Sequence, residues 1–314
     1  MTTRLAAPRT APATPPATAT ATDTGRLGDI ALSVAFVLVW SSGYLVGSIG
    51  ARHGPPLALT FWRFLAAFGV VTLAALASRA PWPAGPRAWL HLLVAGTLLQ
   101  AVQLGGIYLG FAAGVPAGLS SLVLSATPLV VAAAAVPLFA ERLSGRQWLG
   151  LGLGLLGVAL SLGTKLSGAG HRLGGYAFTL LALAGFAAGT LYQKRFGAGV
   201  DLRSGTAVQL LGAAAATLPL AAVHGGLAMP LTAPALGSLA WLATVNSTGG
   251  FLLLFALLRR RTGGAATSLL YLVPPVTALL GVPLLGQPLT AGTVAGMAVS
   301  GVGVALVTLR RQSK

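Results

Sequence analysis

The sequence predicts an all-α integral membrane protein in which ten transmembrane helices form two five-helix repeats of inverted topology. Three observations carry this prediction: the composition, the spacing of the apolar runs, and an internal repeat. Of 314 residues, 55% are hydrophobic and 8% are charged, and the mean hydropathy is +0.83. These values exceed what a soluble domain needs to fill its core. We therefore expect the lipid bilayer to surround most of the chain.

Ten apolar runs have the length of about 20 residues that crosses a hydrocarbon core about 30 Å thick. They span residues 30–50, 57–77, 89–109, 119–138, 145–163, 174–193, 204–223, 236–257, 265–285 and 290–309. These runs are about twice as long as a barrel strand requires and show no alternation of period two, so we expect helices. Residues 1–29, rich in Ala, Thr and Pro, are expected to form a disordered cytoplasmic tail, and residues 310–314 a cytoplasmic C-terminus.

The basic residues predict the orientation. With the N-terminus in the cytoplasm, sixteen of the 20 Lys and Arg residues lie on the cytoplasmic side, three lie outside, and Arg63 lies within a run. This segregation follows the positive-inside rule, so both termini are predicted to be cytoplasmic in a multi-pass inner (plasma) membrane protein. No basic face interleaved with aromatic residues is present, so we expect no nucleic-acid partner despite the formal charge of +16.

A shift of 146 residues superposes Pro128–Leu160 on Pro274–Leu306 without a gap. This offset divides the chain into repeats at 30–163 and 174–309. Because each repeat holds an odd number of helices, the second must enter the membrane from the opposite side. Such repeats supply two alternative packings around a midplane site, which is typical of carriers. A duplicated scaffold without a transport role is the alternative.

Several short segments carry a family resemblance. They are Trp40-Ser41-Ser42, Phe61-Trp62-Arg63-Phe64, and the paired elements PLFAERLS at 137–144 and PLLGQPLT at 283–290. On these residues the chain resembles the drug/metabolite transporter superfamily, in particular EamA-type ten-helix exporters, over residues 30–309. The resemblance implies an exporter. The second element has Gln287 where an acid is common, which argues against an essential carboxylate there.

Polar side chains in the middle of the apolar runs are the candidate binding residues, because a polar group facing lipid costs several kcal/mol. Gln100 lies halfway along the third run, and the repeat offset pairs it with Asn246, halfway along the eighth. We interpret these two amides as part of a midplane substrate site. A hydrogen-bonded clamp that only holds the helices together is the alternative.

Two further polar stripes lie on the fourth and ninth runs. The first holds Ser121, Ser125 and Pro128, and the offset maps these onto Thr267, Tyr271 and Pro274. Each set lies on one helical face. Proline leaves the carbonyl four residues earlier without its partner, so the carbonyls of Leu124 and Leu270 could turn toward a cavity. We predict that the hydroxyls contact substrate and that both prolines act in gating, although Ser and Thr also serve as packing residues.

Arg63 is the only charged residue within a run. We predict that it binds a substrate carboxylate, because charge inside a membrane is costly and usually functional. A snorkelling or carbonyl-bonded structural arginine is the alternative. Trp40, Tyr44 and Tyr108 are expected to shape the cavity wall, although Tyr108 also suits an interfacial aromatic belt.

Absent groups restrict the function further. There is no cysteine, and the four acidic residues and four histidines lie in the tail, in connections or at the ends of runs. A buried proton relay, an enzyme activity, a cofactor and a metal site are therefore not expected. Glycines 150, 152, 154, 157, 292 and 296 predict close helix packing and could support a homodimer.

These observations predict a secondary transporter, working by alternating access, that exports a small neutral or zwitterionic metabolite such as an amino acid. Efflux of a drug or a lipid-linked precursor is one alternative, and a scaffold that does not transport is another.

Overall fold

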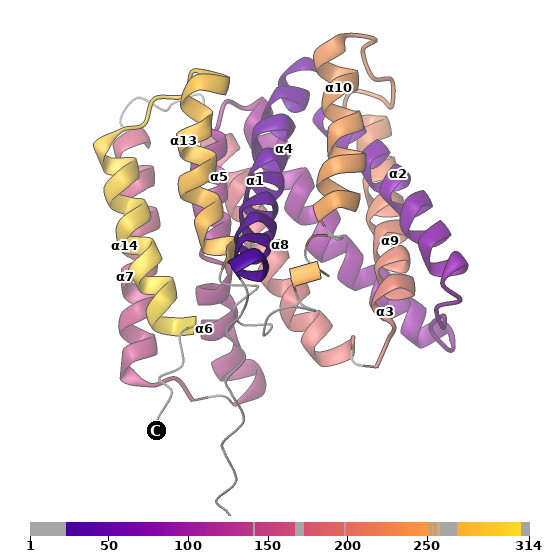
Figure 1. Cartoon of the computed structure of the whole chain (residues 1–314), viewed down its shortest axis with the longest axis horizontal. Coiled ribbons are helices and arrows are strands. Elements are labelled where there is room, and N and C mark those ends of the chain that lie inside the picture. The colour runs from indigo at the N-terminus through magenta and orange to yellow at the C-terminus, as the bar shows by residue number, and fades with distance from the viewer. Residues whose placement is uncertain are drawn as a thin grey trace, which may run out of the picture.

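The computed structural model describes residues 23–140, 142–166, 173–197, 199–250, 253, 256–257 and 269–308, and within these ranges it contains helices and no strand (Figure 1). The first half comprises α1 (Asp23–His53), α2 (Pro56–Ala77), α3 (Pro86–Gly96), η1 (Thr97–Val102), α4 (Gln103–Ala112), α5 (Ala117–Ser125), α6 (Thr127–Phe139) and α7 (Gly145–Leu166). The second comprises α8 (Leu173–Phe196), α9 (Leu202–Val223), α10 (Ala233–Trp241), η2 (Leu242–Gly249), η3 (Leu269–Leu272), α13 (Val273–Leu285) and α14 (Ala291–Thr308).

Six stretches of the described helices are long and apolar enough to cross a membrane. They are Gly28–His53, Pro56–Ala77, Pro86–Ala112, Ala117–Phe139, Leu173–Phe196 and Leu202–Val223. Two shorter apolar helical stretches are Leu269–Leu285 and Ala291–Val307. The chain is therefore a multi-pass helical membrane protein, and the count of ten spans stays a prediction.

Prolines set the starts of several helices. Pro56 opens α2 and Pro86 opens α3, where the fixed φ suits the first turn and the missing N–H would be unpaired in any case. Gly85 turns the chain into α3 with a φ of +83°, a left-handed value that glycine adopts without strain. At the amino end, α1 begins at Asp23, so residues 23–29, expected in the tail, are helical. The prolines of the tail all precede residue 17, which leaves this stretch free to continue the helix.

Three of the predicted runs are interrupted rather than regular. The third run contains a π-helical segment, η1, between α3 and α4, and the eighth contains a second π-helical segment, η2. These segments are repeat partners, because residues 97–102 shifted by 146 fall inside η2. In the fourth run, α5 ends at Ser125 and α6 begins at Thr127, next to Pro128.

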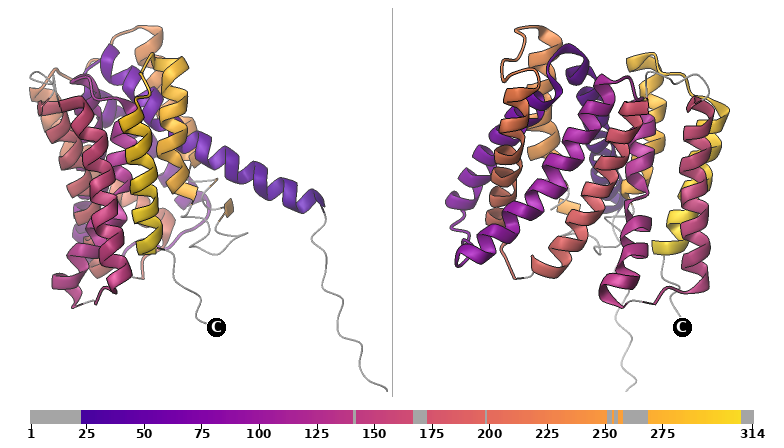
Figure 2. Two further views of the ribbon diagram at one scale, coloured as in Figure 1. Left: turned by 90° about the vertical axis from the view of Figure 1, so that its left-hand side faces the viewer. Right: turned by 180° about the vertical axis from the view of Figure 1, so that it is seen from behind.

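Helices far apart in the sequence pack side by side (Figures 1 and 2). α7 packs along α14, α2 along α9, and α4 along α8. The glycines of α7 are used in this packing: a Cβ at Gly150 or Gly157 would meet α14 within 3 Å, whereas Gly152 faces open space. The glycine face proposed for a homodimer is thus largely buried within one chain, and the homodimer itself stays a prediction.

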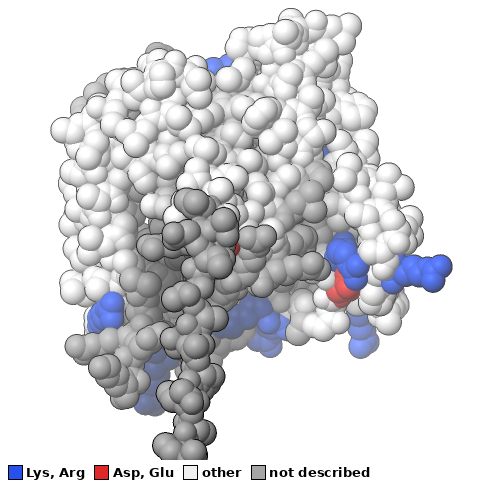
Figure 3. Space-filling model, viewed as in Figure 1, with Lys and Arg blue, Asp and Glu red and all other residues white. Residues whose placement is uncertain are grey.

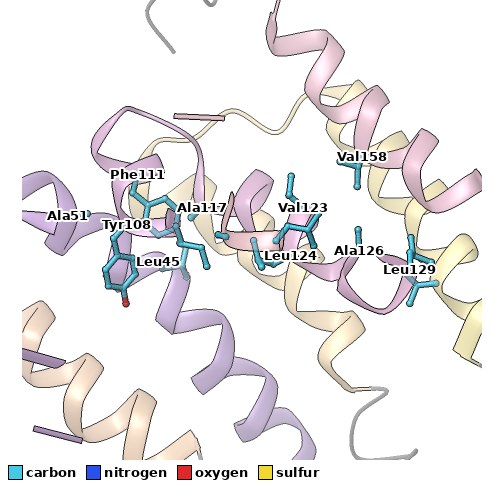
Figure 4. Close-up of a cluster of buried hydrophobic side chains, with 14 of the residues drawn as sticks. Leu45, Ala51, Tyr108, Phe111, Ala117, Val123, Leu124, Ala126, Leu129 and Val158 are labelled. Carbon is cyan, nitrogen blue, oxygen red and sulfur yellow. The ribbon is translucent and has the colours of Figure 1, made fainter. Parts of the chain in front are cut away.

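The main hydrophobic core lies in the middle of the molecule, around Leu45 of α1, Tyr108 and Phe111 of α4, Val123 of α5 and Leu129 of α6 (Figure 4). The first part of α1 extends away from the bundle (Figure 2). In Figure 3 the visible Lys and Arg side chains gather mainly toward the lower end of the molecule, where an acidic side chain also lies. Most of the rest of this face shows neither basic nor acidic side chains.

Candidate substrate site

A cavity of about 580 Å³ lies between the helices and brings the predicted site residues together. Ten of the eleven predicted binding and gating residues line it: Trp40, Tyr44, Arg63, Gln100, Ser121, Ser125, Pro128, Asn246, Tyr271 and Pro274. Thr267 lies outside the described residues. The two halves of the chain thus share one cavity, and whether these residues bind a substrate stays a prediction.

Arg63 of α2 points into the protein and is held by side chains from two other elements. Its Nη2 donates to Asn246 Oδ1 at 2.7 Å, its Nε donates to Ser247 Oγ at 3.2 Å, and its Nη1 donates to the Tyr108 hydroxyl. The side chain is 7% exposed. The arginine therefore does not snorkel toward an interface, and the three groups to which it donates are all neutral.

Asn246 has a second hydrogen bond that ties this cluster to α1. Its Nδ2 donates to the carbonyl oxygen of Val39 at 2.8 Å. The amide sits directly against Gly43, where a Cβ would lie 2.6 Å from Nδ2. Both ends of the Asn246 amide are thus used within the protein, so we interpret Asn246 as a residue that positions Arg63.

Gln100 differs from its repeat partner. It lies in η1 and lines the cavity together with Gln103, one turn further along the helix. Within the described residues, neither amide forms a hydrogen bond to another protein group, so both can reach a ligand. Sequence reasoning missed Gln103, although its spacing of three from Gln100 places it on the same face. It also missed Ser247, Thr127 and Thr190 as lining residues.

Three hydroxyls of the fourth run, those of Ser121, Ser125 and Thr127, are engaged with their own helix. Ser121 Oγ donates to Gly118 O at 2.9 Å, and Ser125 Oγ donates to Leu122 O at 2.6 Å. Thr127 Oγ1 donates to Leu124 O at 2.6 Å, so the carbonyl released by Pro128 is already bonded. A carbonyl oxygen can accept a second hydrogen bond, so the contact of the Leu124 carbonyl with a ligand stays a prediction.

Tyr108 also differs from one of its expected roles. Its side chain is 1% exposed and lies against Gly47, where a Cβ would come within 2.6 Å of the ring. The aromatic belt is therefore the wrong interpretation. Tyr108 instead accepts a hydrogen bond from Arg63 at the cavity wall.

A second hollow of about 620 Å³ adjoins the first, because Leu99, Phe186 and Thr190 line both. Its remaining lining includes Gln193 and Lys194, in the last two turns of α8. The cavity is thus continued toward the carboxyl end of α8, past a second cationic side chain.

The helical bundle and its shared cavity agree with a family match. The model of the EamA-like transporter family matches the chain twice, at residues 27–163 and 173–309. The chain belongs to the EamA-like transporter family. This family is part of the drug/metabolite transporter superfamily, so the resemblance found in the sequence is confirmed.

Individual relatives are also transporters. The EamA-like chain is 31% identical over 281 residues to the uncharacterised inner membrane transporter YedA of Escherichia coli K12, covering 88% of this chain and 89% of that protein. It is 31% identical over 166 residues to a probable amino-acid metabolite efflux pump of Salmonella typhimurium, an alignment that spans 52% of each chain.

A crystal structure superposes with a TM-score of 0.59 at 22% identity, covering 90% of this chain and 96% of the other. At this identity the superposition shows the shared fold alone. The chain thus shares its family with proteins named as transporters.

Proposed function

We propose that this protein is a secondary transporter that exports a small amino-acid-like metabolite by alternating access. The observation that carries the proposal is the buried Arg63, which lines a largely apolar cavity and donates to Tyr108, Asn246 and Ser247. A guanidinium with neutral partners can bind a substrate carboxylate, because carboxylate is the bidentate partner that suits its planar donors. A residue that only stabilised the bundle would not need a charge there.

The proposed architecture is ten transmembrane helices in two inverted repeats, with both termini cytoplasmic. The internal offset, the two family matches and the positions of η1 and η2 support it. So does the packing, because α2 packs on α9 and α7 on α14, each on its repeat partner. In such an arrangement the prolines of α6 and α13 lie where the cavity wall can bend.

A relative named as a probable amino-acid metabolite efflux pump supports the amino-acid class and the direction. The volume of about 580 Å³ and the apolar walls also suit an apolar drug, which is the second candidate. If the protein moves no small ligand, two alternatives remain: it transports a lipid-linked precursor, or it is a scaffold that does not transport.

Counterflow in proteoliposomes tests the proposal. Vesicles preloaded with an unlabelled amino-acid mixture should accumulate labelled substrate, and Gln100→Ala should reduce the initial rate several-fold because its amide faces the cavity. Gln147→Ala is the matched control, since this amide caps the start of α7 outside the cavity. No counterflow with amino acids, their derivatives or drugs from folded protein would contradict a transport function.

A further inference from the structure

We propose that the cavity selects a carboxylate monoanion with an apolar body, such as an N-acylated or 2-oxo derivative of a large apolar amino acid, over the free amino acid. This proposal rests on the transport function proposed above and narrows its substrate class. It departs from the neutral or zwitterionic substrate that the sequence predicts.

The first argument is the charge of the cavity. The sequence has four acidic residues, and of the two whose side chains the structure describes, Asp29 and Asp201, neither lines the cavity. Asp23 and Asp29 lie near the start of α1, and Asp201 pairs with Arg203 at 2.9 Å. Among the described residues that line the cavity, Arg63 is the one with a formally charged side chain.

The second argument is the fate of an ammonium group. A free amino acid at neutral pH carries both a carboxylate and an ammonium. Arg63 compensates the carboxylate, but the described cavity lining holds no carboxylate to compensate the ammonium, which would also lie in the same cavity as the guanidinium. Bringing an uncompensated charge into an apolar cavity is unfavourable. Removing the ammonium charge by acylation or oxidation to the 2-oxo acid removes this cost.

The third argument concerns the remaining hydrogen-bond groups. Gln100 and Gln103 offer amides that can serve an acyl or oxo oxygen as donors. The wall around them includes Phe64, Leu104 and Ile107, which suit an apolar body.

A matched set of probes separates the possibilities on the wild-type protein in proteoliposomes. The probes are L-phenylalanine, N-acetyl-L-phenylalanine, phenylpyruvate and the neutral N-acetyl-L-phenylalaninamide. Each competes with labelled N-acetyl-L-phenylalanine and, separately, with labelled L-phenylalanine in counterflow. We expect the two monoanions to compete at least about tenfold more strongly than L-phenylalanine and the neutral amide.

Arg63→Gln and Arg63→Lys add a second measurement. We expect Arg63→Gln to reduce the preference for N-acetyl-L-phenylalanine over its amide to about onefold, and Arg63→Lys to retain a preference of the same sign. Elution of each variant as a single folded species in size-exclusion chromatography is the check on folding, and the wild-type comparison stands if a variant does not fold.

Each outcome bears on a different statement. L-phenylalanine competing as well as or better than the monoanions would overturn this inference and leave the proposed transport of amino acids intact. Equal competition by the acid and the amide would overturn the role of charge. Absence of counterflow with all four probes would overturn the inference, and if the amino-acid mixture and drugs also fail, the transport function fails with it.

Discussion

At the scale of single residues, one missing methyl group allows the arginine cluster to form. Gly43 of α1 leaves space for Asn246, whose Oδ1 a Cβ at residue 43 would approach to 2.8 Å. That oxygen accepts from Arg63 Nη2. The pocket for a positioning residue is thus made by a glycine on a different helix, which is a contact that sequence spacing does not reveal.

Gly43→Ala should therefore impair transport indirectly, because it disturbs the position of Arg63 although residue 43 does not contact the arginine. The added methyl must displace the Asn246 amide, and losing a hydrogen bond to a charged group costs about 1.5–3 kcal/mol, which corresponds to roughly tenfold or more in counterflow rate. Gly69→Ala, on α2 with open space around it, is the control and should leave the rate unchanged. A Gly43→Ala protein with wild-type counterflow would contradict the coupling.

Asp201 caps the start of α9 outside the membrane-spanning segments. Its carboxylate accepts from the backbone N–H and the guanidinium of Arg203, and these hydrogen bonds lower its pKa to about 2. Because the pKa is lower in the folded protein than in the unfolded chain, the stabilisation is complete above about pH 4 and is lost as the pH falls toward about 2.

Asp201→Ala should lower the melting temperature at pH 7 by roughly 2–4 °C through loss of the cap and the ion pair. Asp201→Asn keeps a side-chain oxygen for the cap, so its melting temperature should lie between those of the wild type and Asp201→Ala. In a thermal-shift series, the difference in melting temperature between wild type and Asp201→Asn should narrow as the pH falls from 5 to 3. A melting-temperature difference that grows as the pH falls over that range would contradict a lowered pKa of Asp201 in the folded protein.

At the scale of elements, the ends of the helices were more predictable than their interiors. The apolar run 89–109 lies inside the helical stretch Pro86–Ala112, yet it is divided by η1. A π-helical turn is locally unfavourable and persists where packing supports it. Here Gly189 of α8 receives Leu99 of η1, a contact between residues 90 positions apart.

The same limit applies to the candidate site. Polar residues inside apolar runs were expected to face a cavity, because lipid excludes them from the outer surface. Those predicted in this way that line one are Arg63, Gln100, Ser121, Ser125, Asn246 and Tyr271. Their partners were not predictable. Tyr108 and Ser247 reach Arg63 only through the packing of α4 and η2 on α2, and neither spacing nor hydrophobicity encodes that packing.

The pairing of α7 with α14 gives a test at this scale. A Cβ at Gly157 would lie 2.8 Å from the Ser300 Cα and closer still to other backbone atoms of α14, whereas one at Gly152 would meet nothing within 4 Å. Gly157→Ala should destabilise the protein by about 1–3 kcal/mol, the usual cost of overpacking, and Gly152→Ala should not. Thermal unfolding in detergent measures both, and equal melting temperatures for the two variants would contradict the packing.

At the scale of the whole molecule, the proposed inverted repeats predict on which side of the membrane each connection between helices lies. α2 and α9 are repeat partners and pack together, yet they should run in opposite directions through the membrane. The connection after α1 and the connection after α9 should then face outward, while those after α2 and after α6 face the cytoplasm.

Single cysteines test this arrangement directly, because the protein has none of its own. His53→Cys and Leu231→Cys should react with a membrane-impermeant maleimide in intact cells, since both side chains are exposed at outward-facing connections. Ser78→Cys and Gly145→Cys, also exposed, should react only after the cells are permeabilised. Labelling of Ser78→Cys in intact cells would reverse the orientation. If His53→Cys and Leu231→Cys lay on opposite sides of the membrane, the repeats would not be inverted. The repeat symmetry would then no longer support a shared midplane site, whereas the hydrogen bonds of Arg63 would still support its role in the cavity.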